Sequence, residues 1–163
     1  MELRGERVRL RPFRPDELDV VLEERQGLFP HMLDRERTRR RLARSGRLAY
    51  GRLDLAIEAA GRVVGEVDAR QPKGAMPPGV FEIGIGLWPE AQGKGYGTEA
   101  VRLLTEHLLA ERGAARVQAS TDVDNAPMRR VLEKLGFVYE GTMRSFMPDG
   151  EGRRDYALYA LTR

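Results

Sequence analysis

Three glycines at alternate positions follow an apolar run in the stretch Leu87-Trp88-Pro89-Glu90-Ala91-Gln92-Gly93-Lys94-Gly95-Tyr96-Gly97-Thr98-Glu99-Ala100. The apolar run, residues 80–88, predicts a buried strand that ends at Pro89, and a helical pattern begins at Thr98. Glycine lets backbone N–H groups come close to an anion, and a helix N-terminus adds unpaired N–H donors and a partial positive charge. Lys94 places a mobile cation at the same point. The stretch therefore predicts a site for a phosphorylated cofactor.

The spacing of the glycines separates this loop from two other phosphate-binding motifs. Dinucleotide folds carry G-x-G-x-x-G and nucleotide P-loops carry G-x-x-x-x-G-K-[ST], and residues 92–97 match neither. Their pattern, Gln-x-x-Gly-x-Gly followed by Thr98-Glu99-Ala100, resembles motif A of the GNAT superfamily of N-acetyltransferases. The resemblance implies that the loop amides wrap the pyrophosphate of acetyl-coenzyme A. For the loop taken alone, a glycine-rich connector that binds nothing is the alternative.

A second segment, residues 124–137, predicts a capped amphipathic helix. Asn125 is a good N-cap, Pro127 stands in the first turn, and Gly136 supplies the C-terminal stop. One helical face carries the apolar residues Met128, Val131, Leu132 and Leu135. The segment is also similar to the family's Asn…Glu-Lys-x-Gly-Phe signature, which implies that Asn125 lies near the pantetheine arm. The two motifs stand in the family's order.

The rest of the chain alternates strand and helix patterns. Strands are predicted at residues 7–13, 53–58, 62–67, 80–88, 116–122, 137–142 and 155–161, and helices from Pro15, over 34–47, over 98–112 and after Asn125. The turn Ala60-Gly61 predicts a hairpin, and the proline-rich residues 71–79 predict a loop at the border of a substrate cleft.

No repeat or linker divides residues 1–163, so one domain is expected. The resemblance implies a GNAT fold of the α/β (α+β) class. Its mixed, mostly antiparallel central sheet would have about seven strands. The sheet would be splayed at the acetyl-coenzyme A site and flanked by helices.

Composition indicates a globular chain and excludes several kinds of site. The 163 residues are 41% apolar and 33% charged, and they suffice for a sizeable core. No apolar run approaches the ~20 residues of a membrane span, and the first residues lack the apolar core of a secretion signal, so no membrane partner and a cytoplasmic location are expected. Cysteine is absent, which excludes an acyl-cysteine intermediate. His31 and His107 are too few for a histidine-rich metal site, so no metal is expected.

Arginine makes up 25 of the 28 basic residues, and seven arginines lie within residues 34–47. Such a cluster raises the question of a nucleic-acid patch. Asp34 and Glu36 balance part of its charge, and the segment has no aromatic residue on which a base would stack. We therefore favour a solvated helix face, or a wall beside an acidic substrate, and expect no nucleic-acid partner.

Acetyl transfer to an amine needs a deprotonated amine, donors for the oxyanion and a stabilised thiolate. The resemblance implies that a backbone amide of the strand before the glycine loop meets the oxyanion, which places the thioester beside Gly86, Leu87 or Trp88. Glu82 is the candidate base because it shares a strand face with Gly84 and Gly86. A carboxylate in an apolar strand is costly unless it is paired or used, so a salt-bridged structural role is the alternative.

The general acid is where the sequence departs from the family. Leu132 stands where many relatives carry a tyrosine, and Met128 stands where the RimJ/RimL branch commonly has a serine. Neither side chain donates a proton, so Tyr139, Ser120 or a water would substitute as the general acid. We take Tyr139 as the candidate acid and Glu82 as the candidate base. A thiolate of pKa ~8.5 leaves with little help. These departures also motivate the alternative of an acyl-coenzyme A-binding regulatory module with little or no catalysis.

The N-terminal Arg-Val-x-Leu-Arg-Pro-Phe and the run that ends at Gly141 look like the RimJ/RimL branch. The resemblance implies direct attack of a primary amine, from a protein N-terminus or a small molecule, on acetyl-coenzyme A in a ternary complex. It also makes a homodimer plausible.

Glu99, near a helix N-terminus, is explained by capping rather than catalysis. The implied cofactor-binding residues are Leu87, Trp88, Gln92, Gly93, Lys94, Gly95, Tyr96, Gly97, Thr98, Asn125 and Arg130.

Overall fold

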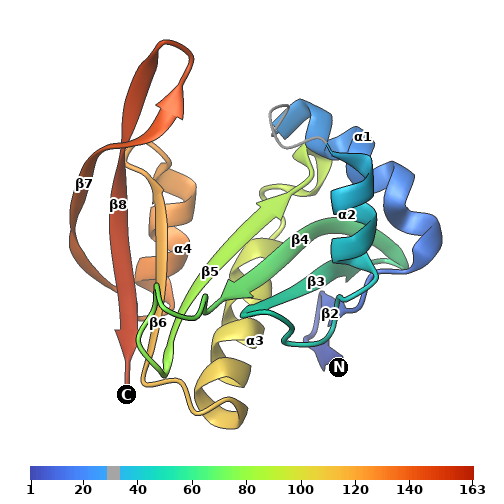
Figure 1. The fold of residues 1–163 in the computed structure, drawn as a ribbon, viewed down its shortest axis with the longest axis horizontal. Coiled ribbons are helices and arrows are strands. Elements are labelled where there is room, and N and C mark those ends of the chain that lie inside the picture. The colour runs from blue at the N-terminus through green and yellow to red at the C-terminus, as the bar shows by residue number, and fades with distance from the viewer. Residues whose placement is uncertain (29–33) are drawn as a thin grey trace.

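A computed structural model describes residues 1–28 and 34–163, and within them one eight-stranded sheet forms the framework (Figure 1). The strands are β1 Leu3–Arg4, β2 Arg9–Arg11, β3 Arg52–Ala59, β4 Arg62–Arg70, β5 Val80–Leu87, β6 Arg116–Asp122, β7 Val138–Asp149 and β8 Gly152–Thr162. Their spatial order is β1-β2-β3-β4-β5-β6-β8-β7, and only β5 and β6 run parallel. The predicted mixed, mostly antiparallel sheet is confirmed, with β1 in addition.

Four α-helices accompany the sheet in the described residues: α1 Leu18–Leu28, α2 Arg35–Leu42, α3 Tyr96–Glu111 and α4 Ala126–Lys134. The short 3-10 turns η1 Pro15–Glu17 and η3 Pro89–Ala91 precede α1 and α3. The prediction of one helix over residues 34–47 was too long, because Ser45 Oγ donates to Leu42 O and Gly46 turns the chain with a φ of 78°. None of these helices combines the length and apolarity that crossing a membrane requires.

Side-chain alternation along the strands sorts the residues into two layers (Figure 1). Leu55 and Ile57 of β3 face α3, where they pack with Val101 and Leu104 in the main core. The intervening Ala56 faces α1 and α2 in a second cluster with Phe13, Val21, Leu42 and Trp88. The half of the sheet before β6 is therefore covered on both faces, and α1 and α2 define the face opposite α3.

The sheet divides between β5 and β6, whose pairing stops after three residue pairs. The last pair is Glu82 with Gln118. Beyond it, β5 continues to pair with β4 as far as Leu87, and β6 continues to pair with β8 as far as Asp122. The two strands therefore diverge in a V, which Figure 1 shows between the green and orange strands. This confirms the predicted splay.

Two hairpins test the turn predictions. Ala60 and Gly61, with φ values of 49° and 75°, join β3 to β4 as predicted, because two left-handed residues match the twist of a hairpin. β7 and β8 form a longer hairpin whose tip extends beyond the rest of the molecule (Figure 1). β7 was predicted only as far as residue 142, because irregular pairing at 139–141 and 143–147 interrupts its alternation.

Candidate functional site

The glycine loop joins the end of β5 to the start of α3. Gly93 and Gly95 have φ values of 74° and 80°, in the left-handed region that favours glycine. Gly95 is the N-cap of α3 and brings no capping side chain. Gln92 closes the turn, because its Nε2 donates to Leu87 O at 3.3 Å. The loop thus presents main chain rather than side chains at the helix start.

Among the described residues, the backbone N–H groups of residues 93–98 have no hydrogen-bond acceptor. Within the described part of the chain, none of them donates to a backbone or side-chain oxygen, whereas the N–H of Glu99 donates to Gly95 O at 3.2 Å. The first N–H groups of a helix have no intrahelical partner, and no side chain of the described residues caps the start of α3. Residues 92–95 are exposed and 96–99 are half-buried. This is an anion-binding arrangement of donors.

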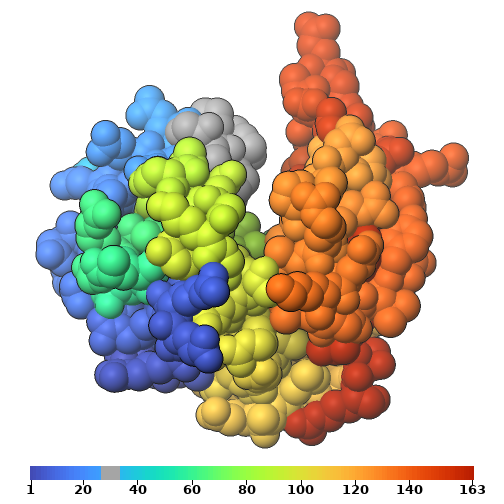
Figure 2. Space-filling model, turned by 180° about the vertical axis from the view of Figure 1, so that it is seen from behind, coloured from blue at the N-terminus to red at the C-terminus, as the bar shows by residue number. Residues whose placement is uncertain are grey.

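Basic side chains surround these donors. Arg7 Nη1 donates to Lys94 O at 3.1 Å and fixes the outside of the loop. Lys94 and Arg130 are exposed, and neither forms an ion pair with any residue that the structure describes. Figure 2 shows a cleft between the region of residues 85–100, which includes the loop of Lys94, and that of residues 120–135, which includes α4 and Arg130. The sequence predicted both.

One edge of β5 is open to the gap between β5 and β6. The N–H of Trp88 donates to Val64 O at 2.9 Å and so points toward β4. Because N–H groups alternate along a strand, those of Leu87 and Ile85 point toward the gap. The side chain of Trp88 is 2% exposed and packs with Phe13. Of the two predicted residues, Leu87 thus has its N–H on the side of the gap, whereas the N–H and the side chain of Trp88 are engaged elsewhere.

Glu82 lies where β5 and β6 separate, and both of its carboxylate oxygens are engaged. Oε1 lies 2.9 Å from Arg70 Nη2, and Oε2 accepts from Gln118 Nε2 at 3.2 Å. The side chain is 23% exposed. This is the salt-bridged arrangement that the sequence allowed as the alternative to a catalytic base.

Tyr139 does not reach the gap. It lies on β7, which is separated from β6 by β8, and its hydroxyl shares a hydrogen bond of 2.6 Å with Thr142 Oγ1. The structure therefore does not bring Tyr139, the predicted proton donor, to the gap, and the sequence does not reveal that β7 is the outermost strand. Ser120 lies on β6 beyond Gln118 and on the same strand face, so it remains beside the gap.

Helix α4 begins directly after Asn125, its predicted N-cap. Its Oδ1 accepts from the N–H of Met128 at 3.2 Å, and its Nδ2 donates to Thr121 Oγ1 at 3.0 Å. Leu132 is fully buried in the main core. The sequence analysis did not identify Tyr159, whose side chain is buried. Its hydroxyl accepts a hydrogen bond from Arg129 Nε and donates one to Glu133 Oε1, each at 2.9 Å. Alternation along β8 was the signal that could have indicated its inward position.

A row of alternating carboxylates and guanidiniums crosses the sheet face under α1 and α2, and sequence reasoning missed it. We call it the ion-pair row, and its members in spatial order are Arg25, Glu66, Arg41, Asp54, Arg52, Asp68, Arg70 and Glu82. Successive members approach within 2.5 to 3.5 Å. Alternation of charged residues on β3, β4 and β5 was the available signal. The row links α1 to the point where the sheet divides.

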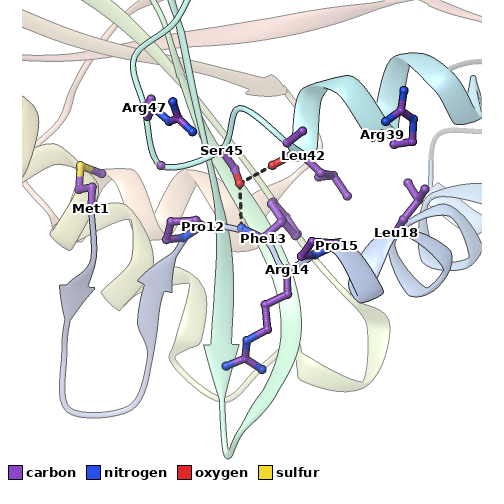
Figure 3. Close-up of a pocket in the computed structure, with 12 residues that line it drawn as sticks. Met1, Pro12, Phe13, Arg14, Pro15, Leu18, Arg39, Leu42, Ser45 and Arg47 are labelled. Carbon is purple, nitrogen blue, oxygen red and sulfur yellow. Dashed lines mark hydrogen bonds between the residues drawn. The ribbon is translucent and has the colours of Figure 1, made fainter.

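A cavity of about 610 Å³ lies apart from the gap, between the segment after β2 and the end of α2 (Figure 3). Its wall is held by Ser45, whose hydroxyl accepts from the N–H of Phe13 at 2.8 Å and donates to Leu42 O at 2.6 Å.

Among the described residues, no group of three or more acidic or histidine side chains could hold a metal ion. His107 is buried in α3, and His31 lies outside the described residues.

Comparison with known proteins gives a consistent assignment. Residues 7–138 match the family model described as an acetyltransferase (GNAT) domain. The chain is 34% identical over 141 residues to a mycothiol acetyltransferase of Pseudarthrobacter chlorophenolicus, covering 81% of this chain and 43% of that protein. It is 33% identical over 81 residues to the uncharacterized N-acetyltransferase YnaD of Bacillus subtilis, covering 50% of this chain and 48% of that protein. The chain thus spans about half the length of these relatives.

A solved structure shares the fold. RimJ of Mycobacterium smegmatis, in complex with a coenzyme A disulfide, matches with a TM-score of 0.79 at 23% sequence identity. The match covers 99% of this chain and 86% of that one.

Proposed function

This chain belongs to the GNAT acetyltransferase family, and from that premise we propose that it transfers the acetyl group of acetyl-coenzyme A to a primary amine. The observation that carries the proposal is the set of backbone N–H groups of residues 93–98, which lack acceptors among the described residues beside an open gap in the sheet. An anion with several oxygens, such as a diphosphate, matches that set of donors.

The residues around the gap divide the work of the transfer. The amides of residues 93–98 hold the diphosphate, and the exposed side chains of Lys94 in the loop and Arg130 in α4 add positive charge. The N–H of Leu87 lies on the strand edge that faces the gap, where it can donate to the oxyanion as the amine attacks the thioester carbonyl. Gln92 keeps the loop in place through its bond to Leu87 O.

The acceptor is proposed to approach from the face that α1 and α2 cover. The ion-pair row lies there, and its members have both signs of charge. The resemblance to the RimJ/RimL branch favours a protein N-terminus, and the mycothiol acetyltransferase relative favours a small-molecule amine. Both acceptors present the same reacting group, a primary amine.

We expect thiol release from acetyl-coenzyme A to depend on an added amine. The probes are a tripeptide with a free N-terminus, the same peptide with an acetylated N-terminus, and spermidine. Release with the free peptide or spermidine, and none with the blocked peptide, is the expected result. Calorimetric binding of acetyl-coenzyme A without release from any probe would instead support the acyl-coenzyme A-binding module. Buried Leu132, which offers no proton donor, is the observation that favours this second function.

Replacing Arg130 by alanine is expected to weaken acetyl-coenzyme A binding about threefold at low salt, since exposed charges contribute modestly. The loss should shrink at high salt, because screening weakens attraction between exposed charges. Calorimetry at two salt concentrations measures both effects. Arg144→Ala is the control, because Arg144 is an exposed arginine on β7, the outermost strand of the sheet. Equal losses in the two variants would count against a local role for Arg130.

A further inference from the structure

Asp68 is the member of the ion-pair row whose two carboxylate oxygens differ most in their surroundings. Oδ2 lies 3.2 Å from Arg70 Nε and 3.4 Å from Arg52 Nη2, and it is buried without a hydrogen bond of good geometry. Oδ1 accepts no hydrogen bond from any described residue. The side chain is 20% exposed, and because Oδ2 is buried this exposure belongs to the Oδ1 side.

Oδ1 extends over the strand that borders the gap. Asp68 on β4 is directly opposite Gly84 on β5. A Cβ atom on Gly84 would lie 2.8 Å from Oδ1, so the carboxylate occupies the space that a side chain would fill there. Gly84 and Gly86 share this strand face, and neither adds a side chain between Asp68 and the open end of β5.

The other carboxylates of the row are occupied. Arg25 Nη2 donates to both oxygens of Glu66, and Arg52 Nε donates to both oxygens of Asp54. Glu82 is held by Arg70 and Gln118. Among the described residues of the row, Asp68 is thus the one carboxylate that accepts no hydrogen bond, and its Oδ1 lies beside the gap.

We propose that Asp68, rather than Glu82, accepts the proton of the acceptor ammonium group through Oδ1, directly or through one water. The inference rests on the proposed function. The ammonium N–H proton passes to Oδ1, and the freed nitrogen lone pair forms the bond to the thioester carbonyl carbon. The C–S bond then breaks, the thiolate takes the second amine proton to give the thiol, and protonated Asp68 releases its proton to water.

The surroundings of Asp68 suit it to this step. Loss of hydration raises the pKa of Asp68 to about 6, and the neighbouring Asp54 and Glu66 also raise it, while Arg52 and Arg70 only partly oppose the rise. A base is most effective when its pKa is near the working pH. Asp68 is ionised at neutral pH and loses its ability to accept a proton as the pH falls through about 6.

We expect Asp68→Asn to lower kcat roughly 100-fold, the lower end of general-base contributions, with little change in acetyl-coenzyme A affinity. The wild-type profile of kcat against pH should fall on the acid side with an apparent pKa near 6, and the variant should lack this limb. The assay is thiol release with acetyl-coenzyme A and the free-amine probe that the wild-type protein uses.

Two variants serve as matched controls. Asp54→Asn removes a carboxylate that shares Arg52 with Asp68 but lies one strand farther from the gap, and Glu82→Gln removes the other candidate base. Both should retain the limb near pH 6. Wild-type kinetics in Asp68→Asn, or loss of the limb in Glu82→Gln alone, would overturn the inference and leave the proposed function intact.

If Asp68→Asn does not fold, the wild-type profile of kcat against pH still tests the role of Asp68 as the base. A profile that does not fall between pH 7 and pH 5 contradicts that role. Absence of amine-dependent release from the wild-type protein would overturn the proposed function, and the role of Asp68 with it.

Discussion

An aspartate in place of Gly95 is expected to weaken acetyl-coenzyme A binding at least about tenfold, or ~1.4 kcal/mol. Gly95 is the N-cap of α3, so the new carboxylate would lie among the N–H groups of residues 93–98. It would satisfy donors meant for the diphosphate and repel its charge. The new Cβ would also lie 2.7 Å from Arg7 Nη1 and displace a guanidinium that holds Lys94 O. Isothermal calorimetry measures the loss.

Two variants separate charge from shape in this experiment. Gly95→Asn has the same size, tolerates a left-handed backbone and carries no charge, so it should lose less affinity than Gly95→Asp. Gly113→Asp places an aspartate just after α3, where φ is 66° and no atom lies within 4 Å of an added Cβ. It should bind as the wild-type protein does. Unchanged affinity in Gly95→Asp would remove the assignment of the glycine loop.

Local signals were sufficient for most of the elements. The strand predicted at 116–122 is β6, because its alternation is uninterrupted, and α4 follows its predicted N-cap, Asn125. α3 begins at Tyr96, two residues before the prediction, because Gly95 rather than a polar side chain is the N-cap. β1 was missed because two residues are too few to show a period.

The site was predictable where it consists of main chain and not where it depends on strand pairing. The donors of the glycine loop follow from glycine spacing and a helix start. The pairing of Glu82 depends on Arg70 and Gln118, which the register of β4, β5 and β6 brings beside it. That register, and the burial of Trp88 against α1 and α2, arise from contacts between distant segments that no local pattern encodes.

Glu99 illustrates the same limit, because it does not cap its own helix. Its carboxylate accepts from the backbone N–H groups of Glu6, Arg7 and Val8 at 3.0, 2.8 and 2.7 Å. It therefore fastens the segment between β1 and β2 to the first turn of α3. Arg7, held in this way, reaches Lys94 O, so Glu99 supports the glycine loop indirectly.

Replacing Glu99 by alanine is expected to lower the free energy of unfolding by roughly 3 kcal/mol, since three hydrogen bonds to a charged acceptor are lost together. Urea unfolding at pH 7 measures the change. Glu106→Ala is the control on the same helix, because the side chain of Glu106 is 59% exposed and pairs only with Arg102 among the described residues. Its loss should be below about 0.5 kcal/mol.

The pH dependence of this difference gives an independent check. Burial raises the pKa of Glu99, but the hydrogen bonds from Arg7, Val8 and Glu6 outweigh it, so the pKa lies below the ordinary 4.5. A lowered pKa means that ionised Glu99 stabilises the fold fully above about 4.5 and loses this contribution as the pH falls through its folded value. The difference in free energy of unfolding between the wild-type protein and Glu99→Ala should therefore become smaller below pH 4.5. A difference that grew on acidification would mean that the protonated carboxyl, not the carboxylate, holds residues 6–8.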